Sequence, residues 1–351
     1  MNASDKPRVV FVVRDWKSRW PEIDALGEAS IAGVQGRIRS GIDAWIVQGY
    51  LRLRDRLRQL GFDVSISEAF PTPPGGAICI AHRDDLNRYG DSLYDCYVIG
   101  VRADRPPLRV AQIEIVQNGL DLSSPRSRFI PSWPQPGLKP RDAVRGACVE
   151  RVAYMGRDNS LPPWYRDGSF IAALASMGIA LDIRERAWNN YSDVDVLIAH
   201  RDETPVMLRQ KPAAKLVNAW LAGVPALLAP EPAYLELRES PLDFMEATDA
   251  DTALRALREL RADPALYHAM VENGRKRARA FTGEAIAARW MDLIIGDAMP
   301  AFEAWRRARP SWPVRYAGHL RDMSAQKILA KGFRRRQRSE LRDQLRHTRS
   351  G

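Results

Sequence analysis

Short runs of β-branched residues alternate with amphipathic segments along most of this chain, and this alternation constrains the fold more than any other feature. Between the runs lie helix-like segments, such as residues 42–60, in which apolar residues recur every three or four positions before Gly61. Strands that alternate with helices predict parallel sheets with helical crossovers. The strand-like runs are Arg8–Val13, Phe62–Ile66, Ala77–Ala81, Cys96–Val101, Val110–Val116, Arg151–Met155, Ile179–Ile183, Val194–Ala199 and Ala226–Ala229.

A proline-rich segment divides this pattern in two. Residues 131–142 contain four prolines between Pro131 and Pro140, and proline fixes φ and lacks a backbone donor, so an extended interdomain linker is expected. We predict an α/β protein with two Rossmann-like parallel-sheet domains that face each other across a cleft. The predicted parts are an N-terminal domain (1–130), the linker (131–142), a second domain (143–295), helices that return toward the first domain (296–325) and a basic helical tail (326–351).

Composition narrows the class of protein. Of 351 residues 45% are hydrophobic and 27% charged, as in soluble globular proteins, and the net charge is +10. Nine basic and two acidic residues lie from Gln326 onward, so the rest of the chain is close to neutral and does not resemble a nucleic-acid-binding domain. The cysteines are isolated, no apolar run is long enough to span a membrane, and the start does not resemble a secretory signal. We therefore expect a cytoplasmic protein.

Residues 210–240 hold the strongest local signal for a site. Pro212 fits the first position of a helix, which places Lys211 at its start and Lys215 in its first turn. A helix N-terminus with two lysines favours a diphosphate, and Asn218, on the same face, is positioned to hydrogen-bond a ribose. Glu231 and Glu236 follow the next predicted strand toward the cleft. The alternative is a solvated helix that bears lysines and ends in an ordinary turn.

The end of this helix resembles a known family. Leu221-Ala222-Gly223-Val224-Pro225 followed by an apolar strand and a glutamate is similar to the donor-binding half of GT-B glycosyltransferases, especially the retaining family 4 group. In that alignment Glu236 matches the family's later glutamate, which contacts the sugar or the nucleotide. The family's paired glutamates fall on Gln210 and Asn218, so both carboxylates are amides here, as in a divergent branch. The resemblance covers about residues 152–290.

The resemblance implies a glycosyltransferase that needs no metal and moves a sugar from a nucleotide-sugar donor to a hydroxyl group, with retention favoured. The second domain would hold the donor, and the first would hold a glycan or lipid-linked acceptor of bacterial cell-surface polysaccharide synthesis. No cofactor is expected, because helix dipole and basic side chains stabilise the departing diphosphate. The alternative function is a two-lobed protein that binds a nucleotide or nucleotide sugar without catalysis.

Residues after other predicted strands complete the candidate site. Gly156 and Arg157 follow Arg151–Met155 and are candidates to approach the diphosphate, while His200 and Arg201 follow Val194–Ala199 and are candidates for the base or the sugar. Ordinary solvated turns are the alternative at both places. No histidine cluster is visible and no Asp-x-Asp follows a strand, so no metal site is predicted.

In the first domain, His82 and Asp15 are the catalytic candidates. Both follow predicted strands, and His82 has an unperturbed pKa near 6.5 that suits a general base for the acceptor hydroxyl. Asp15 is the rival base. A retaining enzyme of the family 4 kind would need neither, and a structural role for His82 at the strand end is the alternative.

The basic tail is predicted to contact a membrane. Apolar residues interleave with arginines from Gln326 onward, which predicts a weakly amphipathic helix able to lie on an anionic membrane surface, here the inner face of the membrane. A solvated tail is the alternative. Nucleic acid is not expected as a partner, since Phe333 is the one aromatic residue among the basic ones. The apolar residues are Ile328, Leu329, Phe333, Leu341 and Leu345.

Overall fold

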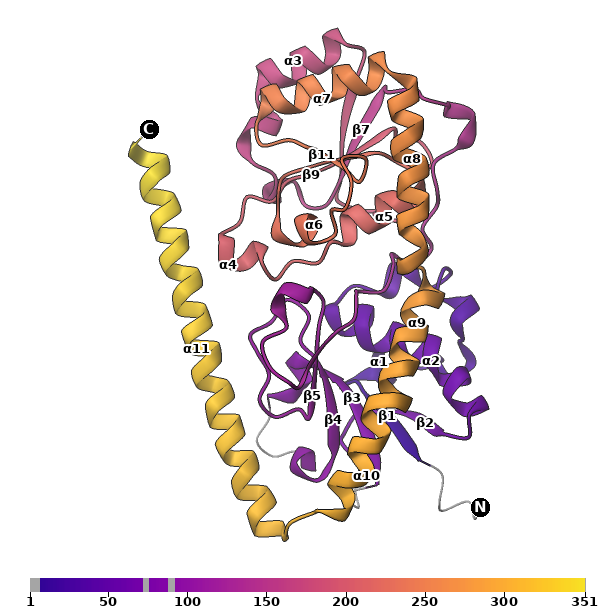
Figure 1. The fold of residues 1–351 in the computed structure, drawn as a ribbon, viewed down its shortest axis with the longest axis vertical. Coiled ribbons are helices and arrows are strands. Elements are labelled where there is room, and N and C mark those ends of the chain that lie inside the picture. The colour runs from indigo at the N-terminus through magenta and orange to yellow at the C-terminus, as the bar shows by residue number, and fades with distance from the viewer. Residues whose placement is uncertain (1–6, 72–75, 88–91, 351) are drawn as a thin grey trace. The chain divides into compact units, whose positions relative to one another are not determined.

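The computed structural model describes residues 7–71, 76–87 and 92–350. Contacts divide the chain into two compact units (Figure 1). Unit 1 comprises residues 1–133 and 283–351, and unit 2 comprises residues 134–282. Each unit is an α/β layer structure built on a parallel sheet, as the sequence predicted.

The sheet of unit 1 has six parallel strands in the order β2-β1-β3-β4-β5-β6. Side chains alternate between its faces: Val9 and Phe11 of β1 belong to one hydrophobic cluster, and Val10 and Val12 to another. Both faces are therefore covered, as a parallel sheet requires. The strands are β1 (Arg8–Val12), β2 (Asp63–Ser67), β3 (Ala77–His82), β4 (Tyr97–Val101), β5 (Ile113–Val116) and β6 (Ser127–Phe129).

Helices from both ends of the chain cover this sheet. On the Val9 and Phe11 face, α2 packs with α9, and Arg56 of α2 forms an ion pair with Glu284 of α9 at 2.6 Å. On the opposite face, Met323 of the long C-terminal helix joins the cluster. The helices are α1 (Trp16–Arg19), α2 (Gln48–Gln59), α9 (Gly283–Asp292), α10 (Met299–Arg307) and α11 (Trp312–Ser350), with π-helical segments at Asp43–Val47 and Leu293–Ala298.

The sheet of unit 2 has five parallel strands in the order β11-β10-β9-β7-β8. The strands are β7 (Arg151–Met155), β8 (Ala180–Arg184), β9 (Val196–Ala199), β10 (Ala226–Leu228) and β11 (Met245–Glu246). One face packs against α3, α7 and α8, and the other against α5. The helices are α3 (Gly168–Ser176), α4 (Pro205–Leu208), α5 (Ala214–Ala222), α6 (Pro232–Glu236), α7 (Ala250–Ala262) and α8 (Pro264–Ala278).

Sequence and structure differ at several boundaries. Two short strands, β6 and β11, have no counterpart in the prediction. The second unit ends at Thr282 rather than at 295, because α9 packs on α2.

The predicted linker is divided between the two units. Trp133 is buried in unit 1 and its indole N–H donates to the carbonyl of Trp45 at 3.3 Å, whereas the backbone N–H groups of Lys139 and Arg141 bond within unit 2. The division therefore falls between Trp133 and Pro134.

The basic C-terminal helix is present but begins earlier than expected, at Trp312. Its residues Met323, Gln326, Ala330 and Phe333 are buried, so the tail does not start free at Gln326. The side chains of residues 344–350 and all of Gly351, which belong to the predicted tail, lie outside the described part of the structure. Within the described residues, no helix has the length and apolarity needed to cross a membrane.

Candidate functional site

A buried ion pair lies at the carboxyl edge of the sheet in unit 2. Arg201 follows β9 and Glu231 follows β10, and neighbouring parallel strands end at the same edge. The Arg201 guanidinium pairs with Oε2 of Glu231, and the Arg201 backbone N–H donates to Oε1 at 3.1 Å. Their side chains are only 7% and 2% exposed. Burial raises the pKa of Glu231, and the charge of Arg201 opposes that rise.

Lys215 adds a second cation to this ion pair. It lies in the first turn of α5, and its Nζ is 5.0 Å from the centre of the Tyr154 ring. Burial, reinforced by the neighbouring charge of Arg201, lowers the pKa of Lys215 to about 7. An anion beside Lys215 would favour the charged form of its amine.

Tyr154 and Gly156 together form the surface beneath Lys215. A Cβ added to Gly156 would lie 2.7 Å from the Tyr154 ring, so glycine is needed for the ring to take its place. The sequence predicted that Gly156 approaches a diphosphate, and this contact stays a prediction; in the structure Gly156 leaves room for the Tyr154 ring. Arg157 is exposed on the following turn. Tyr154 was not among the predicted site residues; its position at the end of β7 was the available signal.

The start of α5 differs from the prediction. The helix begins at Ala214 rather than at Pro212, whose carbonyl instead accepts from the Arg201 guanidinium at 3.3 Å. Lys211 therefore precedes the helix, and its Nζ pairs with Glu203 at 3.2 Å. The predicted common face of Lys211, Lys215 and Asn218 does not form, because Lys211 is outside the helix.

Asn218 has a partner in the chain itself. It is buried, and its carboxamide oxygen accepts from the backbone N–H of Gln135 at 3.2 Å. This bond holds the proline-rich segment at Gln135 against α5. The predicted contact between Asn218 and a ribose stays a prediction.

A cavity of about 250 Å³ opens beside the ion pair. His200 lies on its wall, burial lowers the pKa of this histidine, and Nδ1 of its ring is buried without a hydrogen-bond partner among the described residues. The hydroxyl of Tyr234, whose ring lies 5.5 Å from the Arg201 guanidinium, is also buried without one. Buried polar atoms of this kind ordinarily have a partner, so the site is equipped for a polar ligand. The cavity is lined by His200, Arg201, Leu208, Ala229, Pro230, Glu231 and Thr248.

The predicted residues of unit 2 thus fall into two groups. His200, Arg201, Lys215 and Glu231 come together at one edge, with Lys211 and Glu203 near enough to influence the charge of Lys215. Glu236 is half-buried at the end of α6 and does not line the cavity. Sequence reasoning missed Glu203, Leu208 and Thr248, which come from loops or a one-turn helix without a periodic pattern.

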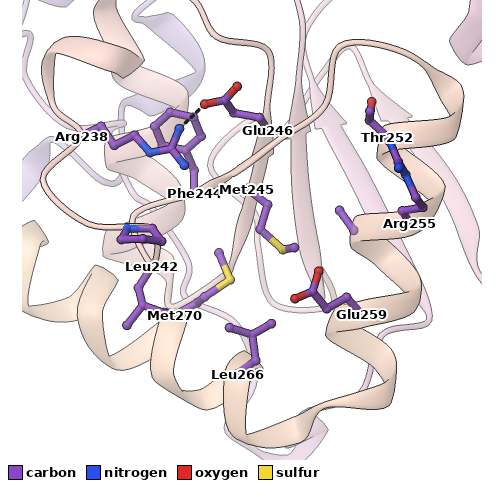
Figure 2. A pocket seen from close by; sticks show the side chains of 12 residues that line it. Arg238, Leu242, Phe244, Met245, Glu246, Thr252, Arg255, Glu259, Leu266 and Met270 are labelled. Atoms are coloured by element: carbon purple, nitrogen blue, oxygen red, sulfur yellow. Dashed lines mark hydrogen bonds and ion pairs between the residues drawn. The ribbon is translucent and has the colours of Figure 1, made fainter.

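A larger groove of about 510 Å³ lies elsewhere in unit 2, beside the edge strand β11 (Figure 2). Met245, Leu266 and Met270 form its apolar floor, and an ion pair between Arg238 and Glu246 closes one side. None of the predicted site residues lines this groove. The larger volume therefore does not coincide with the charged site.

In unit 1, His82 lies at the end of β3 and is 1% exposed. Its Nδ1 accepts from the backbone N–H of Asp84 at 3.2 Å, and burial lowers the pKa of the imidazole to about 4. The ring is therefore neutral at pH 7 with its hydrogen on Nε2, an atom that is buried without a hydrogen-bond partner among the described residues. Asp15 follows the neighbouring strand β1, is exposed, and has φ +62°.

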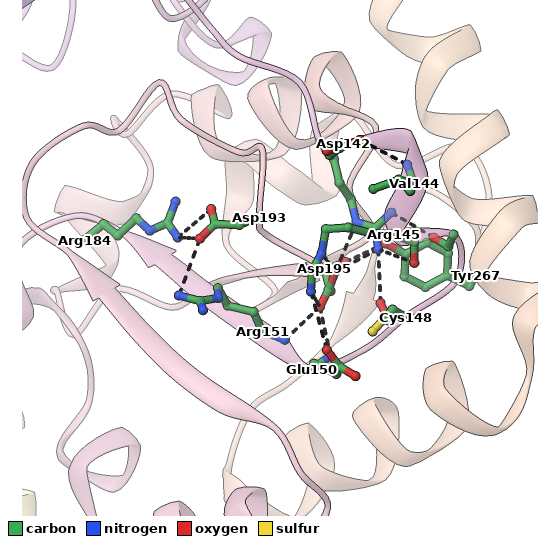
Figure 3. Close-up of polar contacts among 12 residues, drawn as sticks. Asp142, Val144, Arg145, Cys148, Glu150, Arg151, Arg184, Asp193, Asp195 and Tyr267 are labelled. Atoms are coloured by element: carbon green, nitrogen blue, oxygen red, sulfur yellow. Dashed lines mark hydrogen bonds and ion pairs between the residues drawn. The ribbon is translucent and has the colours of Figure 1, made fainter.

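The opposite edge of the unit 2 sheet holds a different buried carboxylate (Figure 3). Asp195, at the start of β9 and fully buried, accepts from Arg141 at 2.7 Å, from Arg145 at 2.7 Å, and from the backbone N–H groups of Glu150 and Arg151. Burial alone would raise the pKa of Asp195, but these donors outweigh it and lower the pKa. This cluster ties the segment after the proline-rich region to the sheet.

Among residues 7–71, 76–87 and 92–350, no group of three or more His, Cys, Asp or Glu side chains is placed to hold a metal ion.

Solved structures share this architecture. A sucrose-phosphate synthase from Thermosynechococcus elongatus matches with a TM-score of 0.52 and 13% identity, over 82% of this chain and 98% of that one. AviGT4, a glycosyltransferase involved in avilamycin A biosynthesis, matches with a TM-score of 0.51 and 15% identity, over 82% of this chain and 96% of that one. A glycosyltransferase from Rickettsia africae matches with a TM-score of 0.50 and 8% identity, over 82% of this chain and 98% of that one. No protein-family model and no curated protein matches the sequence.

At these identities the similarities establish the fold alone. The chain has the GT-B fold of glycosyltransferases, with two parallel-sheet α/β units and a basic C-terminal helix. The predicted class, an α/β protein with two parallel-sheet domains of the GT-B type, is confirmed.

Proposed function

We propose that this protein is a glycosyltransferase that binds a nucleotide-sugar donor at the carboxyl edge of the sheet in unit 2. The observation that supports this most directly is the convergence of Lys215, Arg201 and Glu231 beside the cavity. In open parallel sheets, ligands bind outside the carboxyl ends of the strands. The GT-B fold agrees with this class of reaction, although a fold does not fix a function.

Each group has a role in the proposed transfer. Lys215, with its pKa near 7, takes up a proton as the diphosphate binds and then stabilises the negative charge that develops when the bond from sugar to phosphate breaks. Glu231 fixes the Arg201 guanidinium, so that the second cation is already oriented. Because Lys215 gains a positive charge as the diphosphate binds, we propose transfer without a metal ion.

The acceptor side of the proposal rests on unit 1. We assign the acceptor hydroxyl, from a glycan or a lipid-linked glycan of cell-surface polysaccharide synthesis, to the strand ends that hold His82 and Asp15. The His82 ring is neutral and buried, so we do not expect it to act as the base. That agrees with retention, in which the departing phosphate accepts the acceptor's proton. The proposed location is the cytoplasm, with peripheral attachment to the membrane.

A binding protein without catalysis is the second candidate, favoured by two amides. Gln210 and Asn218 occupy the positions of the family's paired glutamates, and both are buried. The carboxamide oxygen of Asn218 is engaged by Gln135. A site without those carboxylates could hold a nucleotide sugar without turning it over.

A thermal-shift screen tests the proposal. The purified protein is heated with UDP, GDP, ADP, CMP, TDP and their sugars in EDTA, since a ligand of the folded state raises the melting temperature. We expect one nucleotide class to stabilise the protein, and its sugar to be consumed when acceptor is added. Stabilisation without turnover supports the binding protein, and no shift with any ligand contradicts both candidates.

A further inference from the structure

One side of α11 presents basic side chains from Lys327 to Arg342 and exposed apolar side chains near them. Lys327, Lys331, Arg335, Arg338 and Arg342 follow each other at intervals of four, four, three and four residues, so they lie along one side of the helix. All five are exposed, and among the described residues Arg335, Arg338 and Arg342 take part in no ion pair. Within the described residues, the part of this stripe formed by Arg335, Arg338 and Arg342 is thus not compensated by acidic side chains.

Exposed apolar residues lie on this same side. Val314, Ile328 and Arg335 are separated by fourteen and seven residues, which brings both apolar side chains close to the stripe. Their exposed fractions are 58% for Val314 and 71% for Ile328, and Leu320 between them is 37% exposed. These residues and the five basic ones together form what we call the outer face of α11.

The inner face of the same helix is fixed to unit 1. His319, Met323, Gln326, Ala330 and Phe333 are buried at intervals of four, three, four and three residues. Gln326 accepts from the backbone N–H of Arg109 at 3.0 Å and donates to the carbonyl of Leu86 at 3.1 Å. The outer face is therefore held on a folded unit and is not part of a loose tail.

From these observations we infer that the outer face of α11 binds the surface of a bilayer that contains anionic phospholipid. A straight row of cations can meet a flat, negatively charged surface along its whole length, while the exposed apolar side chains enter the boundary between headgroups and acyl chains. A nucleic-acid duplex would attract the cations, but its phosphate backbone has no apolar region in which Val314 and Ile328 could be buried. Single-stranded nucleic acid binds through aromatic residues, and this face has none. The inference is independent of the proposed donor site.

The test is cosedimentation of the full chain with phosphatidylcholine vesicles that contain or lack phosphatidylglycerol. We expect binding to the anionic vesicles alone, and a loss of binding as salt concentration rises. The variant Arg335→Gln/Arg338→Gln/Arg342→Gln should lower the partition coefficient at least tenfold. The matched variant Arg258→Gln/Arg275→Gln/Lys276→Gln removes the same charge from exposed positions in unit 2 and should bind as the wild type does.

A second variant separates insertion from simple attraction. Ile328→Gln keeps the charge and should lower the partition coefficient severalfold, whereas Leu329→Gln, on a neighbouring flank, should change it little. Circular dichroism checks that each variant is folded. Equal binding by the stripe variant and its control would overturn the inference, as would a preference for duplex RNA over anionic vesicles at the same salt. Nucleotide binding should be the same in all variants, so failure here removes the proposed membrane attachment and leaves the proposed sugar transfer intact.

Discussion

Unit 2 holds a buried carboxylate at each edge of its sheet, and the two differ in how completely they are satisfied. Asp195, at the amino edge, accepts from two arginines and two backbone N–H groups, and its pKa is lowered. Glu231, at the carboxyl edge, has the Arg201 guanidinium and one backbone N–H, and its pKa is raised. Asp195 lies within a network of chain segments, whereas Glu231 lies beside a cavity.

This contrast separates a charge that the chain itself satisfies, Asp195, from one that we propose serves a ligand, Glu231. A buried charge whose donors all come from the chain stabilises the fold and leaves little for a ligand to add. A buried cluster with a raised carboxylate pKa, a lowered lysine pKa and unpartnered polar atoms nearby has capacity left for a substrate.

The largest effect expected from this comparison is on stability. Asp195→Ala leaves Arg141 buried without its carboxylate, and should lower the free energy of unfolding of unit 2 by about 3–5 kcal/mol. Asp193→Ala, which removes a half-exposed partner of Arg184, should cost only about 1 kcal/mol or less. Urea unfolding of both variants measures this difference. Equal losses of unfolding free energy would show that the buried carboxylate of Asp195 stabilises the unit no more than the half-exposed one of Asp193.

The two carboxylates should also affect stability with opposite dependence on pH. The raised pKa of Glu231 means that its contribution to stability is fully present below its unfolded pKa and is lost as pH rises through the folded pKa. The lowered pKa of Asp195 means that its contribution is present above its unfolded pKa and is lost as pH falls through the folded one.

Unfolding free energies of wild type, Glu231→Gln and Asp195→Asn between roughly pH 3 and pH 7 test this difference. The advantage of wild type over Glu231→Gln should shrink as pH rises, while its advantage over Asp195→Asn should grow. If the stability advantage of wild type changed in the same direction with pH for both variants, the two carboxylates would be electrostatically alike.

The sequence predicted features that depend on neighbouring residues better than contacts between residues far apart in the chain. The main strands were predictable because β-branched runs mark them, and Arg201 and Glu231 could be placed at one edge because both follow such runs. β6 and β11 were missed because three and two residues form no pattern. The contacts of Asp195 with Arg141, 54 residues earlier, have no local sequence signature.

Local rules also failed at the start of α5. Pro212 favoured a helix from that position, but its carbonyl is occupied by Arg201 and the helix starts two residues later. That shift removed Lys211 from the predicted face and left Lys215 as the lysine at the cluster. A contact between distant segments outweighed a local preference.

The smallest predicted effect concerns Asn218. Its carboxamide oxygen accepts a hydrogen bond from the backbone of the chain, as the carboxylate of Asp195 does, although sequence analysis placed Asn218 at the ligand. Asn218→Ala should lower the free energy of unfolding by about 1 kcal/mol, the typical net value of one hydrogen bond. Nucleotide affinity should stay within about threefold of wild type, a change of less than 1 kcal/mol. Urea unfolding and titration calorimetry measure the two quantities. A tenfold loss of affinity would instead place Asn218 at the ribose.

The claim that the carboxyl edge binds a nucleotide diphosphate is tested most directly by titration calorimetry with the nucleoside diphosphate selected in the thermal-shift screen, with EDTA present. For wild type we predict binding with proton uptake near pH 8, because the diphosphate restores the charge of Lys215. Lys215→Met should bind at least tenfold more weakly without that uptake, while Lys276→Met, at an exposed position on α8, should match wild type. Unchanged affinity in Lys215→Met would contradict the account.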